Sequence, residues 1–314
     1  METLIPRAWG ALLCAVALAG PAEARITRDV EQGGLHGTLT LPDATAPPVP
    51  AVLILAGSGP VDRDGNMPGL RNDGLKQLGD ALAEHGIASL RIDKRGVGAS
   101  AATTTREDQL RIDTYVADAV SWIEVLRQQP EIARVVMLGH SEGALVATLA
   151  AQQSDVAGLV LVAGAGDPAP VLIERQLAAA GAPRPLQEAS RSIAQRLARG
   201  EEVEDVPPEL SPLYRTSVQP YMVSWFQRDP AAELGKTTAP VLILQGGTDL
   251  QVDTEQAWKL ASARPGAQMV VVEGMNHVLK SAPANRAANL ATYGDAAAPL
   301  APGLVPAIAA FVAP

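Results

Sequence analysis

The chain has 314 residues, enough to bury a large core, and one α/β domain with an insertion is the simplest organisation at this length. Its formal net charge of −9, without any Lys/Arg-rich run, argues against a nucleic-acid-binding surface and gives no sign of a polyanionic partner. Aromatic residues make up only 3% of the chain, so the core has to pack mainly aliphatic side chains.

The first 24 residues have the pattern of a secretory signal peptide. Arg7 supplies a positive charge, residues 9–19 form a short apolar stretch, and residues 22–24 form an A-x-A cleavage site. The apolar stretch is short for a membrane span, and a retained anchor is the alternative. We expect an exported protein, periplasmic or secreted, that is cleaved near Ala24 and has no stable membrane anchor. Cleavage would also remove Cys14, the one cysteine, so the mature chain could exist in an oxidising compartment without any disulfide.

Predicted strands and helices alternate over the first half of the mature chain. Strands at residues 26–31 and 35–41 around Gly33-Gly34 predict an antiparallel hairpin, and residues 47–50 a stiff Pro-rich connector. The elements predicted next are a strand at 51–56, a helix at 73–85, a strand at 87–93, a helix at 114–129, a strand at 135–138, a helix at 144–151 and a strand at 157–163. This alternation is typical of a parallel sheet covered by helices on both faces.

The alternation stops after residue 165. Residues 167–234 contain helical stretches rich in Ala, Leu, Arg and Glu, interrupted by prolines, and no β-like run. We interpret this segment as a helical cap inserted into a catalytic domain that consists of residues 25–166 and 235–314. In the second part of that domain, the sequence predicts a strand at 240–245, a helix at 254–263, a strand at 268–273 and a closing helix at 302–312.

The segment Gly139-His140-Ser141-Glu142-Gly143 lies between a predicted strand and a predicted helix. Strand, sharp turn and helix in that order are the context of a nucleophile elbow. Ser141 would then occupy a strained turn at the carboxyl end of the sheet, where Gly139 and Gly143 leave room for it. Considered alone, these five residues could also be an ordinary glycine-rich turn.

A serine hydroxyl needs a base within hydrogen-bond reach, and the base needs an acid that orients it. Of the four histidines, His36 lies in the predicted hairpin, His85 at a helix end and His140 inside the elbow. His277 is different, because it follows the strand at 268–273 and so lies on a loop at the carboxyl edge of the sheet. We therefore predict that His277 is the base.

The predicted acid is Asp249, which directly follows the strand at 240–245. Asp167 follows the strand at 157–163 at the same edge of the sheet and is the alternative. Asp253 falls near the start of the next predicted helix, where an aspartate is often a cap.

Acyl transfer through a tetrahedral intermediate requires N–H donors where the oxyanion forms. One predicted donor is the backbone amide of Glu142, at the helix start beside Ser141. The other is the amide of Ser58 in Gly57-Ser58-Gly59, whose small residues let the backbone approach a substrate. A plain turn is the alternative for this loop.

From residue 51 to residue 312 the sequence resembles the α/β-hydrolase superfamily. More narrowly, it resembles the bacterial EstD-type carboxylesterases, close to the serine-aminopeptidase and monoglyceride-lipase group. The segments that carry the resemblance are LILAGSGPVDRDGN (53–66), SLRIDKRGVGAS (89–100), VMLGHSEGA (136–144), LQGGTDLQV (244–252) and GMNHVLK (274–280). Among them, GSGP-x-DRDGN is the most distinctive for the subgroup.

The resemblance implies an α/β-hydrolase fold, that is, a mostly parallel twisted sheet flanked by helices with an inserted helical cap. It also implies Ser141 as nucleophile, Asp249 as acid and His277 as base, and the chain order of the three matches that superfamily. The amides of Ser58 and Glu142 would form the oxyanion hole.

Other residues of these motifs have less direct roles. By the same resemblance Asp93 and Arg95 organise the loop next to the site. Four polar residues that either line the pocket or support its loop are Asp62, Arg63, Asp64 and Asn66. The cap is the least recognisable part of the sequence, and in this superfamily the cap usually dictates the choice of substrate.

The expected function is hydrolysis of small-molecule carboxylic esters with short-to-medium acyl chains through an acyl-enzyme intermediate. Aminopeptidase or amidase action with the same three residues is one alternative, and a non-catalytic binding module on this fold is another. We expect no cofactor and no metal, because no His/Cys cluster has ligand spacing and the glycine-rich turns lack a phosphate-binding pattern.

Overall fold

The computed structural model describes residues 25–42, 48–103 and 106–313. The predicted signal peptide, its cleavage site and Cys14 lie outside the described residues. Within the described ranges, no helix has both the length and the apolar character needed to cross a membrane.

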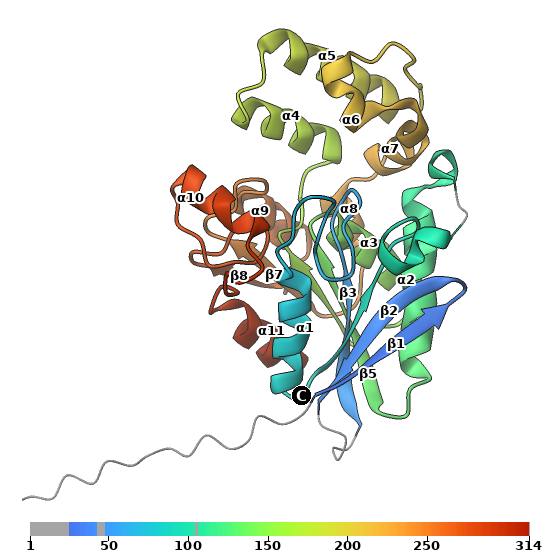
Figure 1. Cartoon of the computed structure of the whole chain (residues 1–314), viewed down its shortest axis with the longest axis vertical. Helices are drawn as coiled ribbons and strands as arrows, with labels where there is room; N and C mark the ends of the chain where they lie inside the picture. Colours follow the sequence, from blue (N-terminus) through green and yellow to red (C-terminus); the bar gives the residue numbers. More distant parts are fainter. Residues whose placement is uncertain (1–24, 43–47, 104–105, 314) are drawn as a thin grey trace, which may run out of the picture.

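An eight-stranded sheet forms the centre of the described chain (Figure 1). Its strands are β1 (Ile26–Gln32), β2 (Leu35–Leu41), β3 (Val49–Leu55), β4 (Ala88–Ile92), β5 (Ile132–His140), β6 (Gly158–Val162), β7 (Val241–Gly246) and β8 (Gln268–Val272). Their order across the sheet is β1-β2-β4-β3-β5-β6-β7-β8. Strands β3 to β8 run parallel to one another, whereas β2 is antiparallel to both β1 and β4.

Helices cover the sheet and extend beyond it. They are α1 (Gly74–Glu84), α2 (Ile112–Arg127), α3 (Glu142–Ala151), α4 (Ala169–Ala179), α5 (Arg184–Ala198), α6 (Ser211–Tyr214), α7 (Gln219–Phe226), α8 (Pro230–Gly235), α9 (Thr254–Ala263), α10 (Arg286–Ala291) and α11 (Leu304–Val312). Short 3₁₀ helices occur at Gly98–Ala102, Glu107–Gln109, Pro208–Leu210, Thr216–Val218 and Thr292–Gly294.

Two apolar layers pack on opposite faces of the sheet. Side chains of a strand alternate between its faces, and in β3 Leu53 and Leu55 join the layer made with α2, α3 and α9. Val52 and Ile54 join the layer made with α1 and α11. Because both faces of the central strands are buried, their sequences are continuous apolar runs rather than alternating ones.

The predicted alternation of strands and helices and the α/β fold class are confirmed. One local expectation is wrong: Val49 and Pro50, predicted as part of a connector, belong to β3. The Val49 amide donates to the Glu131 carbonyl at 2.8 Å, and the strand register shifts between Val49 and Pro50. A proline without an N–H is tolerated here because it lies at the start of the strand.

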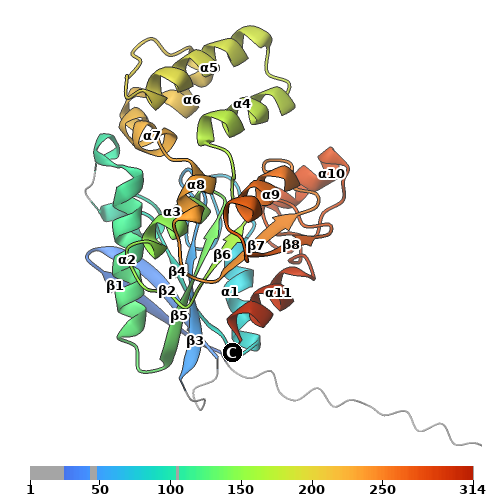
Figure 2. The ribbon, with the colours of Figure 1, turned by 180° about the vertical axis from the view of Figure 1, so that it is seen from behind.

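Residues 167–234, all of which are described, contain helices α4 to α8 and no strand. Helices α4 to α7 lie together beyond one end of the sheet in both ribbon views (Figures 1 and 2). They share an apolar cluster of their own, with Leu197, Tyr214 and Phe226 among its buried members. Helix α8 instead contacts α3 and α9, so the end of this segment packs beside the sheet.

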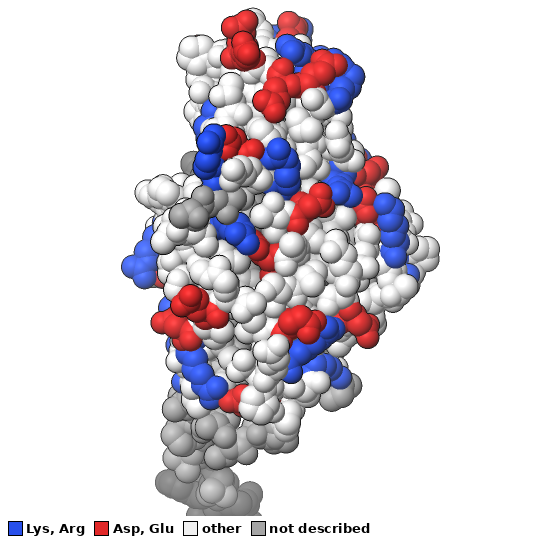
Figure 3. Space-filling view, turned by 90° about the vertical axis from the view of Figure 1, so that its right-hand side faces the viewer, with Lys and Arg blue, Asp and Glu red and all other residues white. Residues whose placement is uncertain are grey.

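Charged side chains connect the 167–234 segment to the rest of the chain. Arg228 pairs with Asp113 at the start of α2 at 2.9 Å, and Arg215 pairs with Glu107. On the face of the molecule shown in Figure 3, acidic and basic side chains are interspersed.

Candidate active site

Ser141 lies in the sharp turn between β5 and α3. Its backbone angles are φ 55° and ψ −122°, a conformation that L-residues rarely adopt. The surrounding hydrogen bonds hold this turn, because the Ser141 amide donates to the Val162 carbonyl at 2.9 Å and the Ala144 amide donates to the Ser141 carbonyl at 3.0 Å. The hydroxyl therefore projects from the carboxyl end of the central strands, as the glycine-flanked motif predicts.

The two glycines of the motif are required by close backbone contacts. A Cβ atom on Gly139 would lie 2.1 Å from the Gly143 carbonyl oxygen, and one on Gly143 would lie 2.5 Å from the Leu55 carbonyl oxygen. Neither neighbour is a flexible side chain that could move away. The turn therefore forms only with glycine at both positions.

Asp249 and His277 meet at the ends of β7 and β8. The distance from His277 Nδ1 to Asp249 Oδ2 is 2.9 Å, and the exposed fractions of the two side chains are 8% and 0%. Asp249 Oδ1 accepts from the amides of Gln251 and Val252 at 2.8 and 3.0 Å. Burial raises the pKa of Asp249, but His277 and the two amide hydrogen bonds outweigh that effect and hold its pKa below the ordinary value. The carboxylate is therefore the favoured form.

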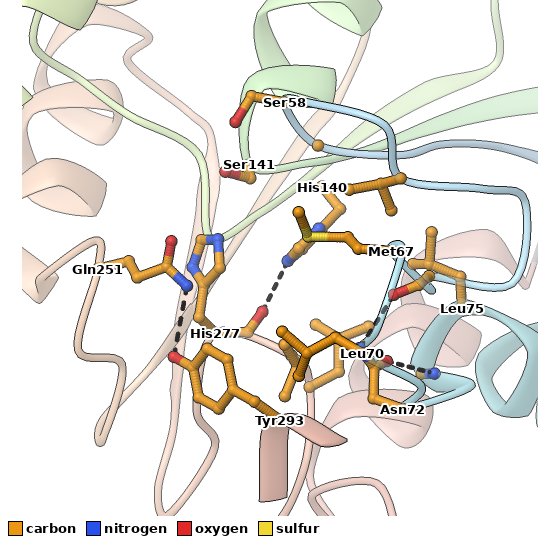
Figure 4. A pocket seen from close by; sticks show the side chains of 16 residues that line it. Ser58, Met67, Leu70, Asn72, Leu75, His140, Ser141, Gln251, His277 and Tyr293 are labelled. Atoms are coloured by element: carbon orange, nitrogen blue, oxygen red, sulfur yellow. Dashed lines mark hydrogen bonds between the residues drawn. The ribbon is translucent and has the colours of Figure 1, made fainter. Parts of the chain in front are cut away.

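Ser141 and His277 line the same cavity. In Figure 4 the edge of the imidazole ring opposite Nδ1 is directed toward the Ser141 side chain. Within the described part of the chain, the Ser141 hydroxyl makes no hydrogen bond, so it is free to turn toward the ring. Nucleophile–base contacts are often loose in unliganded sites and tighten on substrate binding.

Asp167, the alternative acid, points elsewhere. Its carboxylate accepts from Lys259 Nζ at 2.7 Å and from Gln256 Nε2 at 2.9 Å, and these contacts keep its pKa low although burial alone would raise it. Asp253 occupies the N-cap position of α9, where its side chain makes no capping hydrogen bond. Asp249 is thus the predicted acid that contacts His277.

The two residues that carry the predicted oxyanion donors lie close to Ser141. Glu142 is the first residue of α3, and amides in the first turn of a helix have no acceptor within it. Ser58 follows β3 and lines the cavities that also contain Ser141. Figure 4 shows Ser58 next to Ser141, on the neighbouring loop.

Two cavities meet at Ser141. The first has a volume of about 210 Å³, and its apolar lining residues are Val61, Met67, Leu70, Leu75, Val278 and Leu279. At one side of it, Gln251 Nε2 and the Tyr293 hydroxyl lie 3.5 Å apart near His277 (Figure 4). The second, of about 70 Å³, lies toward the 167–234 segment and includes Leu145, Trp225 and Pro230.

The polar residues of the 62–66 loop mainly hold that loop in place. Arg63 donates to Asp93 through its amide at 2.8 Å and through Nε at 2.9 Å. Asp64 pairs with Arg91. Asn66 Oδ1 accepts from the amides of residues 72 and 73 at 2.9 Å each. These contacts favour the structural interpretation of the loop residues over pocket lining.

The loop next to the site is organised by the residues after β4, as the resemblance implies. Asp93 also accepts from the Ala99 amide at 2.9 Å, and Arg95 pairs with Asp118 on α2 at 2.6 Å.

Three residues of the site were missed by sequence reasoning. His140 Nε2 donates to the His277 carbonyl at 2.7 Å, the Tyr221 hydroxyl donates to Glu142 Oε1 at 2.7 Å, and Lys94 contacts the Ser58 loop. For Lys94 a signal existed, because it follows a strand that ends at the same edge of the sheet as Ser141. For Tyr221 there was none, because its partner is 79 residues away in the chain.

The described residues include no group of three or more His, Cys, Asp or Glu side chains placed to hold a metal ion.

Comparisons with known proteins agree with this architecture. The sequence model of the family described as serine aminopeptidase, S33, matches residues 73–281, more than half of the chain. Esterase EstD of Thermotoga maritima is 30% identical over 260 residues, which cover 81% of this chain and 60% of EstD. The chain thus spans about 60% of the length of this curated relative.

Solved structures show the same fold at low sequence identity. Est1E from Butyrivibrio proteoclasticus with bound ferulic acid has a TM-score of 0.56 at 18% identity, with 84% of this chain and 94% of that chain covered. A puromycin-hydrolyzing peptidase of Mycobacterium tuberculosis has a TM-score of 0.54 at 20% identity, with 83% and 38% covered. With this fold and the match to residues 73–281, the chain belongs to the serine aminopeptidase S33 family of α/β-hydrolases.

Proposed function

We propose that this protein is an exported serine hydrolase that cleaves carboxylic esters of short-to-medium acyl chains through an acyl-enzyme. The observation that carries the proposal is the 2.9 Å contact between His277 and Asp249 beside a serine held in a strained elbow. A serine, a histidine and a buried carboxylate that meet at one cavity are the parts that nucleophilic acyl transfer requires.

In the proposed mechanism, Ser141 Oγ attacks the ester carbonyl carbon while His277 Nε2 accepts its proton. The Asp249 carboxylate holds the ring through Nδ1 and stabilises the imidazolium. The amides of Ser58 and Glu142 donate to the oxyanion of the tetrahedral intermediate. His277 then protonates the leaving alcohol, and a water molecule releases the acid from Ser141 in a second step of the same kind.

Similarity to Esterase EstD supports ester hydrolysis. The mostly apolar cavity of about 210 Å³ beside Ser141 supports a short-to-medium acyl chain. We assign the cavity of about 70 Å³ to the alcohol portion, with residues 167–234 acting as the cap over it.

A parallel assay tests the reaction. The purified protein that begins at Arg25 is expected to hydrolyse p-nitrophenyl esters from acetate to octanoate faster than the laurate ester. Ser141→Ala should lower kcat by at least about 10³-fold without changing the fold, since the nucleophile is lost. Wild-type rates in Ser141→Ala would contradict the proposal.

Aminopeptidase or amidase action is the second candidate, favoured by the family match itself. It uses the same three residues but must protonate an amine leaving group. Alanine p-nitroanilide, assayed beside the esters, separates the two: a larger kcat/KM for the anilide would assign the protein to this second class.

Export rests on residues 1–24, where Arg7, the apolar stretch and the A-x-A sequence form the predicted signal peptide. Expression of the full chain in a Gram-negative host should give a periplasmic or secreted product whose N-terminal residue is near Arg25. A cytosolic product that keeps its first residues would contradict export.

A further inference from the structure

Lys94 holds the loop that carries Ser58. Its ammonium group donates to the Gly57 carbonyl and to the Gly59 carbonyl, each at 2.5 Å. The residue lies two positions beyond the end of β4, and its side chain is partly buried. One cation thus binds the carbonyl oxygens of the two residues that flank Ser58 in the chain.

Because of the geometry of the peptide unit, the contact between Lys94 and the Gly57 carbonyl also affects the direction of the Ser58 N–H. In a trans peptide, the C=O and the N–H of the same unit point in opposite directions. None of the described peptide bonds is cis. The Gly57 carbonyl belongs to the same unit as the Ser58 N–H, so a cation that fixes the carbonyl also fixes the N–H in the opposite direction.

Ser58 and Lys94 line different cavities. Ser58 lines the cavities that contain Ser141, and Lys94 lines neither of them. Lys94 and Gly59 line a third cavity, of about 290 Å³. Lys94 therefore contacts the loop from the third cavity, and the trans peptide geometry directs the Ser58 N–H away from Lys94.

Lys94 also faces the second predicted donor residue. Its charge interacts with the buried Glu142 carboxyl, whose Oε1 accepts from Tyr221 on α7. Burial lowers the pKa of Lys94 and raises that of Glu142, and the attraction between the two partly offsets both shifts. The Tyr115 ring centroid lies 5.8 Å from Lys94 Nζ, a cation–π contact that further confines the ammonium group.

We propose that Lys94 is a positioning residue that orients the Ser58 N–H toward the oxyanion. The inference rests on the proposed function of Ser141 and deepens it. Lys94 touches no reacting atom; it acts through the peptide unit that joins Gly57 to Ser58.

Lys94→Met tests the proposal, because methionine keeps the apolar stem and removes the donor. Loss of one oxyanion donor lowers kcat by about 10²- to 10³-fold. In Lys94→Met the Ser58 donor is only misoriented, so kcat for p-nitrophenyl butyrate should fall less, by about 10- to 100-fold. KM should stay within about twofold of the wild-type value. The matched control is Lys76→Met, which removes an exposed lysine of α1 paired with Asp80 and should keep the wild-type rate.

A transition-state analogue separates positioning from general damage to the fold. A trifluoromethyl ketone forms a tetrahedral adduct with the serine and uses the oxyanion donors, so its Ki should rise by the same factor as kcat falls. Binding of the intact ester to Ser141→Ala and to the Ser141→Ala/Lys94→Met double variant should give equal Kd values, because the ground state makes little use of these donors.

Chemical rescue covers the case in which Lys94→Met folds poorly. In Lys94→Ala, added propylammonium replaces the missing part of the side chain and should restore part of kcat. Tetramethylammonium, which has no N–H, should not. Partial rescue by the first cation alone supports the proposal, and equal effects of both cations overturn it.

The outcomes distinguish this inference from the proposed function. An active wild type with an equally active Lys94→Met variant overturns the role of Lys94 and leaves the proposed function intact. A wild type that is inert toward every ester and anilide overturns both. A fall in kcat without any change in the Ki of the trifluoromethyl ketone overturns positioning of the oxyanion donor.

Discussion

At the scale of single residues, the candidate site depends on how the two oxygens of Asp249 are used. Oδ2 contacts His277, and Oδ1 is held by the amides of Gln251 and Val252. The carboxylate therefore cannot rotate without breaking hydrogen bonds, and it selects the tautomer of His277 with the proton on Nδ1. In that tautomer Nε2 is free to accept a proton from Ser141.

Asp249→Asn should keep the fold and lose most of the activity. An amide in this position cannot stabilise the imidazolium and favours the wrong tautomer, a change that costs about 10⁴-fold in kcat in a serine protease. We expect a loss of about 10³- to 10⁴-fold for p-nitrophenyl butyrate.

The control for this variant is Asp167→Asn, the same substitution at the alternative acid. Asp167 binds Lys259 and Gln256 rather than His277, so its loss should leave most of kcat. If Asp167→Asn were inactive and Asp249→Asn active, the acid would be Asp167 and the role predicted for Asp249 would be wrong.

His140 should make the stability of the protein depend on pH. Burial, with a smaller contribution from His277, lowers the pKa of His140 from 6.5 to about 4. In the unfolded chain the ring takes up a proton below about pH 6.5, whereas the folded chain resists until about pH 4. The contribution to stability is therefore complete above pH 6.5 and falls, by up to about 3 kcal/mol, as the pH drops toward 4.

The measurement is urea unfolding of wild type and His140→Gln across this pH range. Glutamine can still donate to the His277 carbonyl but does not titrate, so the free energy of unfolding of the variant should fall less steeply with acidification. Identical pH dependence in the two proteins would show that His140 does not titrate as inferred.

At the scale of secondary-structure elements, the β5–α3 connection requires an unusually close approach of backbones. Ser141 has positive φ, and the flanking glycines are in contact with main-chain atoms. The flanking strands β3 and β6 fix the position of β5, and this surrounding structure holds Ser141 in its strained conformation.

Gly139→Ala should therefore destabilise the whole element. The added Cβ would overlap the Gly143 carbonyl, and the expected loss in free energy of unfolding is about 3 kcal/mol or more, with loss of any activity toward p-nitrophenyl butyrate. Gly294→Ala is the control, because its Cβ would meet only Leu70 Cδ2 at 3.5 Å. Chemical denaturation of both variants checks the difference, and equal stabilities would contradict the close contact.

At the scale of the whole molecule, patterning predicted most of the fold. The central strands are buried on both faces and alternate with helices, so their apolar runs and the intervening helical periods were visible in the sequence. The contact between Asp249 and His277 was also predictable, because both residues directly follow parallel strands and such strand ends meet at one edge of the sheet. Their catalytic roles, with that of Ser141, stay predictions.

Other parts of the site have no local pattern. Lys94 binds carbonyls more than thirty residues away in the chain, and Tyr221 reaches Glu142 from the least recognisable segment. Such contacts join residues that are distant in the chain and form only when helices and strands pack together, so neither periodicity nor motif spacing predicts them. The sequence also did not predict that β3 begins at Val49. The Val49 amide donates to the carbonyl of Glu131, which precedes β5 and is distant in the chain.

Covalent labelling followed by peptide mapping shows whether His277 and Asp249 make Ser141 nucleophilic. A fluorophosphonate should modify wild type at Ser141 alone, fail to modify Ser141→Ala, and react at least about 100-fold more slowly with His277→Ala. An adduct on another residue, or an unchanged labelling rate in His277→Ala, would contradict a nucleophilic role of Ser141 with His277 as its base.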